Sequence, residues 1–161
     1  MNPIDVMFYG QRTTLRAIES LAPGDWLRPG ALGTWTVKDI VGHLGAFEKR
    51  MVEVLGPFAG EAIEPVLMAV VEATFNDVQA AVRAGWTVVQ VMAEFQDAHV
   101  RVMELARRIP GKGWREVGTI PWYGPEYSLD DLVVYQIYGH KREHSAQIDS
   151  ARSPGDQASG R

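Results

Sequence analysis

The sequence of 161 residues contains no cysteine. This absence excludes disulfide bonds, thiolate nucleophiles and cysteine-ligated zinc, so a metal ion would have to be held by histidine, carboxylate, amide or water ligands. Basic residues are also too few to favour a nucleic-acid partner, because 16 Lys and Arg stand against 20 Asp and Glu and give a formal net charge of −4. With hydrophobic residues at 46%, the chain can still bury a core of ordinary size.

Long apolar runs and targeting segments are missing as well. The longest mostly apolar stretch, around Pro65–Phe75, is interrupted by Glu72. It falls short of the roughly 18 consecutive apolar residues that a membrane-spanning helix needs. The first residues, Met1–Asp5, have neither the basic region nor the apolar run of a signal peptide. We therefore expect no membrane partner and a cytoplasmic location.

Helical periodicity dominates what the sequence does contain. Apolar residues recur at helical spacing in four long segments, and we expect helices over residues 3–21, 36–55, 88–109 and 128–150. The last three open with a capping-box spacing, in the pairs Thr36 with Asp39, Thr87 with Gln90, and Ser128 with Asp131. Between the second and third helices, Pro65 is positioned to open a short helix that Gly85 would end.

Four long helices joined by substantial loops predict an all-α four-helix bundle. We expect residues 1–150 to form one domain. Before the last helix, residues 112–127 hold three Gly, two Pro and two Trp, which predicts a long structured loop with room for a short hairpin. From residue 151 onward the chain is rich in Ser, Gly, Asp and Gln, and residues 151–161 are predicted to be a disordered tail.

The clearest chemical signal is a pair of histidines in the last predicted helix. Its core stripe reads Leu129, Val133, Ile137, His140, His144, Ile148. Two consecutive core positions are therefore His140 and His144, and residues four apart project from one side of a helix, as in a two-point metal chelate. The alternative is that each imidazole bonds a carbonyl or a water. Because two unpartnered buried imidazoles would each cost on the order of 1–3 kcal/mol, a shared metal ion is the favoured interpretation.

Two further histidines lie on other predicted helices. His43 stands beside Ile40 and Leu44 on the core face of the second helix. Alone it would be interpreted as a core-edge histidine, but with a facing pair it becomes the natural third ligand. Three imidazoles leave coordination positions open, which is typical of a catalytic site, and they suit a divalent ion such as zinc, nickel or iron. His99 lies at the edge of its stripe and is expected to contact the site or bind water.

Two segments resemble the DinB-like superfamily. Trp35–Leu44 is similar to the family segment W-[ST]-x-x-[DE]-[LIV]-x-x-H-L, and Tyr138–Ile148 is similar to its closing H-x-x-x-H-x-x-Q-I helix. The resemblance covers essentially the whole ordered chain. It implies an up-down-down-up bundle, a metal site on His43, His140 and His144, and a homodimer. The superfamily includes DNA-damage-inducible proteins, YfiT-type metal-dependent hydrolases, and thiol-dependent transferases and isomerases.

The leading interpretation is a metal-dependent hydrolase or thiol-dependent transferase. It would act on a small electrophilic molecule, with a low-molecular-weight thiol as candidate cosubstrate. The alternative is a non-catalytic ligand-binding or sequestration protein with a structural metal.

No catalytic acid or base is indicated by the sequence. Asp39 is explained as a helix cap, Glu48 is expected to point away from His43, and Arg142 and Glu143 are expected to face solvent. The aromatic residues at the loops would either line the mouth of a pocket above the metal, or seal the bundle end or a dimer contact; they are Trp35, Trp122, Tyr123 and Tyr127.

Overall fold

The structure is a computed structural model that describes residues 2–153, and within this range it is helical and contains no β-strand. The elements are α1 (Pro3–Glu19), η1 (Pro23–Leu27), α2 (Val37–Phe58), α3 (Glu72–Arg83), α4 (Val88–Arg108), α5 (Gly111–Arg115), α6 (Leu129–Leu132), η2 (Val133–Gly139) and α7 (His140–Ser150). The predicted all-α class is confirmed. Most of the predicted disordered tail, residues 154–161, lies outside the described residues.

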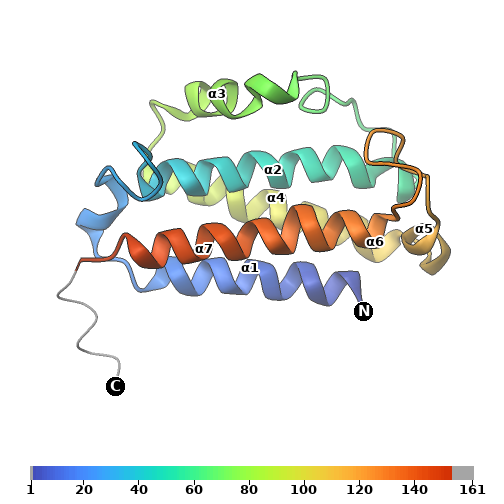
Figure 1. The fold of residues 1–161 in the computed structure, drawn as a ribbon, viewed down its shortest axis with the longest axis horizontal. Helices are drawn as coiled ribbons and strands as arrows, with labels where there is room; N and C mark the ends of the chain where they lie inside the picture. Colours follow the sequence, from blue (N-terminus) through green and yellow to red (C-terminus); the bar gives the residue numbers. More distant parts are fainter. Residues whose placement is uncertain (1, 154–161) are drawn as a thin grey trace.

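Four long helical segments lie side by side (Figure 1). They are α1, α2, α4 and a last segment in which α6, η2 and α7 continue one another. Figure 1 shows α1 and the last segment running in one direction and α2 and α4 in the other, with α3 crossing back over α2. The closest packing is between α2 and α4 and between α1 and the last segment.

The predicted capping boxes are all formed. The hydroxyls of Thr36, Thr87 and Ser128 each accept a hydrogen bond from the backbone N–H three residues on. In return, the side chain at that third position accepts from the N–H of the cap residue. Because each box satisfies two otherwise unpaired backbone donors, α2, α4 and α6 begin where the sequence predicts.

The predicted end of α2 and the predicted start of the helix that follows it are both wrong. The helix continues through Gly56 and Pro57 to Phe58, and its last turn is closed by the N–H of Ala59, which donates to the carbonyl of Leu55 at 3.0 Å. A proline so near the helix end removes one internal hydrogen bond without breaking the helix. The predicted short helix begins at Glu72 and not at Pro65.

A side chain explains why residues 62–71 are not helical. The carboxylate of Glu53 on α2 accepts hydrogen bonds from the backbone N–H groups of Leu67 and Met68, both at 2.8 Å. A carboxylate that takes these donors offers the backbone an alternative to a helix. Residues 112–127 form no hairpin: the short helix α5 takes up the start of this segment and buries Trp114, and residues 116–127 are turns and loop.

The apolar core is divided into two clusters. One cluster lies toward α5 and α6 and includes Met7, Met51, Val102 and Leu132, while the other lies toward η1 and includes Ile18, Leu44, Phe95 and Ile148. Along every long helix, a buried polar residue stands between the two clusters; these residues are Gln11, Glu48, His99 and Lys141. The core therefore has a polar layer near its middle.

Lys141 is the centre of this polar layer. Its ammonium forms an ion pair with Oε1 of Glu48, and it donates a hydrogen bond to Oε1 of Gln11 at 2.8 Å. The other carboxylate oxygen of Glu48 lies 3.2 Å from Nδ1 of His99. Burial alone would raise the pKa of Glu48, but the adjacent Lys141 and His99 hold it below its usual value. One network thus joins α1, α2, α4 and α7.

We predict that Lys141→Met lowers the free energy of unfolding by about 3–5 kcal/mol, because it leaves the Glu48 carboxylate buried without its cation. The measurement is urea denaturation of the metal-free protein. The double variant Glu48→Gln with Lys141→Met should lose less free energy of unfolding than Lys141→Met alone, because it leaves no buried charge without a partner.

The matched control is Lys112→Met. The ammonium of Lys112 lies 3.6 Å from Glu116, but its side chain is 85% exposed. Removing such a surface pair should cost less than about 1 kcal/mol. Equal effects at Lys141 and Lys112 would show that the buried pair does not stabilise the fold.

Candidate metal centre

Three imidazoles meet in the groove between α2 and α7. His43 projects from the middle of α2, and His140 and His144 project from successive turns of α7. Nε2 of His140 lies 2.8 Å from Nε2 of His43 and 2.9 Å from Nε2 of His144. His43 and His144 are buried and His140 is partly buried. The predicted trio is brought together, and its ring nitrogens are close enough to share one metal ion.

A second contact orients one of the rings. Nδ1 of His144 lies 2.7 Å from Oε1 of Gln147, one turn further along α7. An amide oxygen only accepts, so Nδ1 carries the proton and the lone pair of Nε2 is directed at the other two imidazoles. Such a bond to the second nitrogen is the usual way in which a metal-binding histidine is fixed in one tautomer.

The electrostatics keep the imidazoles neutral. Burial first, and then the nearby His140, His144 and Arg83, together lower the pKa of His43 from 6.5 to about 3. The pKa of His140 is lowered to about 4, first by burial and then by His144 and Lys141. Burial also lowers the pKa of His144. Neutral imidazoles with free lone pairs are the form that binds a metal ion, so the donor set fits a divalent cation.

Aromatic rings cover one side of the cluster. The ring of Phe47 lies 4.7 Å from that of His43 and 4.6 Å from that of His140, measured between centroids. Trp35 lies edge-on to His43, with 5.3 Å between the ring centroids. Behind Phe47, the fully buried Phe75 of α3 packs edge-on at 5.1 Å. These rings shield the imidazoles from water on that side.

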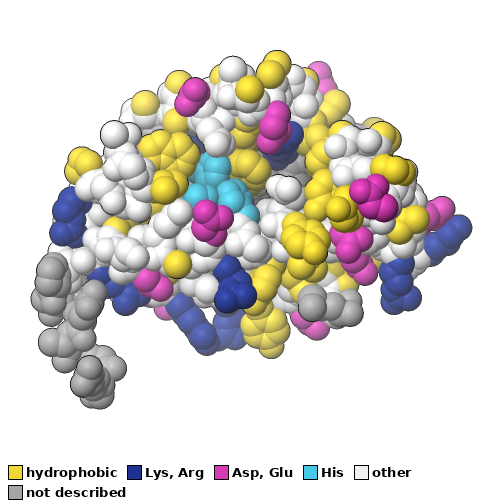
Figure 2. Space-filling view, viewed as in Figure 1, with side chains coloured by type: hydrophobic (Ala, Val, Ile, Leu, Met, Phe, Trp, Pro, Cys, Tyr) yellow, Lys and Arg dark blue, Asp and Glu magenta, His cyan; other side chains and the backbone are white. Residues whose placement is uncertain are grey.

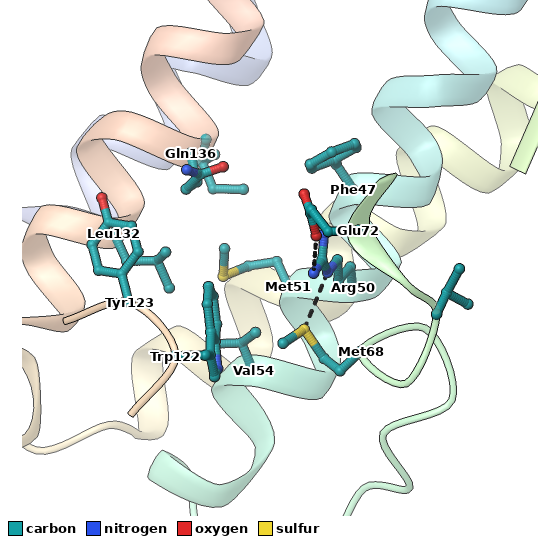
Figure 3. Close-up of a pocket in the computed structure, with 12 residues that line it drawn as sticks. Phe47, Arg50, Met51, Val54, Met68, Glu72, Trp122, Tyr123, Leu132 and Gln136 are labelled. Atoms are coloured by element: carbon teal, nitrogen blue, oxygen red, sulfur yellow. Dashed lines mark hydrogen bonds and ion pairs between the residues drawn. The ribbon is translucent and has the colours of Figure 1, made fainter. Parts of the chain in front are cut away.

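A pocket of about 520 Å³ opens next to the histidines. Phe47 links the pocket to the histidines, because its ring contacts an imidazole and also lines the pocket. Trp122 and Tyr123, from the loop before α6, form part of the opposite wall (Figure 3). In the space-filling view, histidine side chains reach the surface beside a hollow bordered by hydrophobic side chains (Figure 2). Of the four loop aromatics, Trp122 and Tyr123 therefore line a pocket that adjoins the histidines at Phe47.

The helix that carries His140 is irregular just before it. Residues Val133–Gly139 form the π-helical segment η2, and α7 starts at His140. π-helical turns are rare, and they occur often at functional sites, where they change the direction in which side chains project. Nothing in the apolar periodicity of this segment indicates the wider turn.

A model of the DinB superfamily matches residues 9–148. The chain belongs to the DinB superfamily. No curated protein and no solved structure matches the chain. The matched range contains His43, His140 and His144, so the predicted membership is confirmed over the part of the chain that carries the three imidazoles.

The other polar residues considered in the sequence of this DinB-superfamily chain lie either at the positions expected for them or in the polar layer. Asp39 caps α2, and Arg142 and Glu143 are exposed, as expected. Glu48 points away from His43 as expected, but into the polar layer instead of to solvent, where it contacts His99. His99 therefore belongs to that layer and is not part of the trio that could hold a metal.

Two residues near the site were not anticipated from the sequence. Lys141 follows His140 directly, yet its side chain is 2% exposed and lies in the core. Arg50 lines the pocket with Phe47. The spacing of His43, Phe47 and Arg50 at i, i+4 and i+7 was the available signal, since these positions share one helix face.

The lowered pKa values predict a pH-dependent stability of the metal-free protein. An unfolded chain protonates His43 near pH 6.5, whereas the folded chain does so only near 3. Between these values the unfolded state binds more protons, so stability falls as the pH falls. From pH 7 to 5.5 we expect a loss of about 1 kcal/mol from His43 alone.

Urea denaturation of chelator-treated protein at both pH values measures this loss. Carboxylates remain ionised over most of this window, so they contribute little to it. The control is His43→Leu, in which the difference between the two pH values should shrink. A wild-type stability that does not change from pH 7 to 5.5 would contradict the prediction.

Proposed function

We propose that this member of the DinB superfamily is a small metal-dependent enzyme whose ion is held by His43, His140 and His144. The observation that carries the proposal is the convergence of three neutral imidazole nitrogens beside a pocket large enough for a small molecule. Three protein ligands leave coordination positions for substrate or water. A bound zinc, nickel or iron(II) ion would supply a Lewis acid and would lower the pKa of a water or thiol.

The reaction class that fits is hydrolysis, or transfer of a low-molecular-weight thiol, on a small electrophilic molecule. The role of the protein is to bind and orient. Gln147 fixes the tautomer of His144, Phe47 and Trp35 limit water at the imidazoles, and the pocket places the substrate next to them. The homodimer and the cytoplasmic location remain predictions. Within residues 2–153, no helix combines the length and apolar character needed to cross a bilayer.

We predict one divalent ion per chain. Elemental analysis of untagged protein, after the chelator-treated form is reloaded with zinc, nickel or iron(II), should give a ratio close to one, because three ligands converge on one point. His140→Ala should abolish this uptake. His99→Gln is the matched control and should keep the wild-type ratio, since His99 faces Glu48 and not the trio. Equal uptake by wild type and His140→Ala would reject the site.

Activity is tested on the same samples. Loaded and metal-free protein are assayed with a nitrophenyl ester, for hydrolysis, and with an aryl chloride plus a small thiol, for transfer. Metal-dependent turnover that His140→Ala lacks supports an enzyme. Stoichiometric metal binding without turnover in either assay, together with loss of helical circular dichroism on chelation, would favour the alternative of a binding protein with a structural metal.

A further inference from the structure

A cation lines the pocket that adjoins the candidate metal centre at Phe47. On α2, Arg50 follows His43 by seven residues and shares its helix face, with Phe47 between them. Seven residues of α-helix rise about 10 Å, so the guanidinium belongs to a region two turns away from the imidazoles. Arg50 and Phe47 both line the pocket of about 520 Å³. Phe47, which contacts His43 and His140, therefore separates the imidazoles from the part of the pocket that Arg50 lines.

The guanidinium of Arg50 is nearly buried but weakly partnered. Its side chain is only 14% exposed, and it stacks over the ring of Phe75 at 4.8 Å. Nε donates to the thioether sulfur of Met68 at 3.2 Å. A thioether is a weak acceptor, and a guanidinium withdrawn from water is ordinarily paired with a carboxylate or phosphate. Among residues 2–153, the guanidinium of Arg50 thus contacts only this sulfur, the Phe75 ring and one exposed carboxylate, that of Glu72.

The carboxylate that pairs with Arg50 among the described residues is easily displaced. Nη2 of Arg50 lies 2.6 Å from Oε2 of Glu72, the first residue of α3 (Figure 3). The Glu72 side chain is 73% exposed, so it can leave Arg50 and remain solvated. An ion pair with so exposed a partner contributes little to stability. Glu72 shows that a carboxylate fits against Arg50 from the side of the pocket.

The remaining wall is apolar and aromatic. Met51 and Val54 of α2 face Leu132 of the last helical segment, and Trp122 covers one side (Figure 3). Ile137 of that segment also lines the pocket. Gln136 adds a neutral amide on the side opposite Arg50. A ligand that fills this space must bury an apolar body and must bring one negative charge to one cation.

We propose that the pocket binds a small amphipathic carboxylate. Its carboxylate displaces Glu72 and pairs with Arg50, and its apolar body lies against Phe47 and Trp122. The inference deepens the proposed function, on which its role as a substrate site rests, because an apolar body that lies against Phe47 is next to a ring that contacts His43 and His140. A single guanidinium matches the single charge of a carboxylate, whereas phosphate-binding sites gather several donors.

The test is calorimetric binding of a matched series to metal-free protein at pH 7.5. The probes are 4-phenylbutyrate, 4-phenylbutyramide and 4-phenylbutylamine, which differ only in the charged end. Removing the metal ensures that the carboxylate cannot bind the ion instead of Arg50. We expect the carboxylate to bind about tenfold more tightly than the amide, because a charged hydrogen-bonded pair replaces a neutral contact, and the amine to bind most weakly.

Two substitutions should act in opposite directions. Arg50→Gln should weaken 4-phenylbutyrate about tenfold and leave the amide nearly unchanged. Glu72→Gln should strengthen 4-phenylbutyrate about two- to fivefold, because the competing carboxylate is gone. Lys49→Gln is the matched control: it also removes one positive charge from α2, but Lys49 is half exposed and pairs with Glu94. It should bind all three probes like wild type.

Each result decides the proposal. Equal binding of carboxylate and amide, or equal weakening of both by Arg50→Gln in a variant with unchanged circular dichroism, overturns it. An unchanged affinity in Glu72→Gln overturns the displacement step. This outcome is separable from that of the proposed function. Carboxylate selectivity without metal-dependent turnover supports carboxylate binding in the pocket and rejects the enzyme. Metal-dependent turnover without carboxylate selectivity supports the enzyme and rejects carboxylate binding at Arg50.

Discussion

The arrangement of this protein depends on one buried ion pair, that of Glu48 with Lys141. Two charges withdrawn from water are costly unless each is paired and hydrogen-bonded, and the partners here come from every long helix. Gln11 of α1 accepts a hydrogen bond from Lys141, and His99 of α4 contacts the carboxylate of Glu48. Sliding any helix along its axis by one turn would remove a partner. The polar layer thus fixes the longitudinal register of the helices, which apolar contacts alone specify less sharply.

That register also sets the position of the imidazoles. Lys141 directly follows His140, so holding its ammonium against Glu48 fixes how far α7 is advanced along α2 and how it is rotated. The same placement brings Nε2 of His140 to 2.8 Å from Nε2 of His43. Charge from the layer reaches the site as well. Burial and then His144 lower the pKa of His140 most, while Lys141 lowers it and Glu48 raises it from within the layer.

Sequence reasoning succeeded where the signal is local. Capping boxes and the four-residue spacing of His140 and His144 are properties of one helix, so they could be predicted without knowing what packs against it. The partners of Glu48 could not be predicted from the sequence, because a charged residue on a helix is ordinarily solvated and its burial depends on which helix faces it. The non-helical stretch before α3 was missed for the same reason, since Glu53 of α2 takes its backbone donors.

Where Arg50 lies depends on tertiary structure in the same way, and this has a chemical consequence. The crossing of α3 covers α2 on the side of Phe75, so that Arg50 is withdrawn from solvent and its guanidinium borders the pocket. The pocket has the guanidinium of Arg50 in its wall, adjoins the imidazoles at Phe47, and is lined largely by apolar side chains between these two places. Such a site distinguishes the two ends of a ligand. A molecule anchored by its carboxylate at Arg50 would therefore lay its apolar body against Phe47, next to the imidazoles, and orientation of this kind is a large part of what a binding site contributes to a reaction.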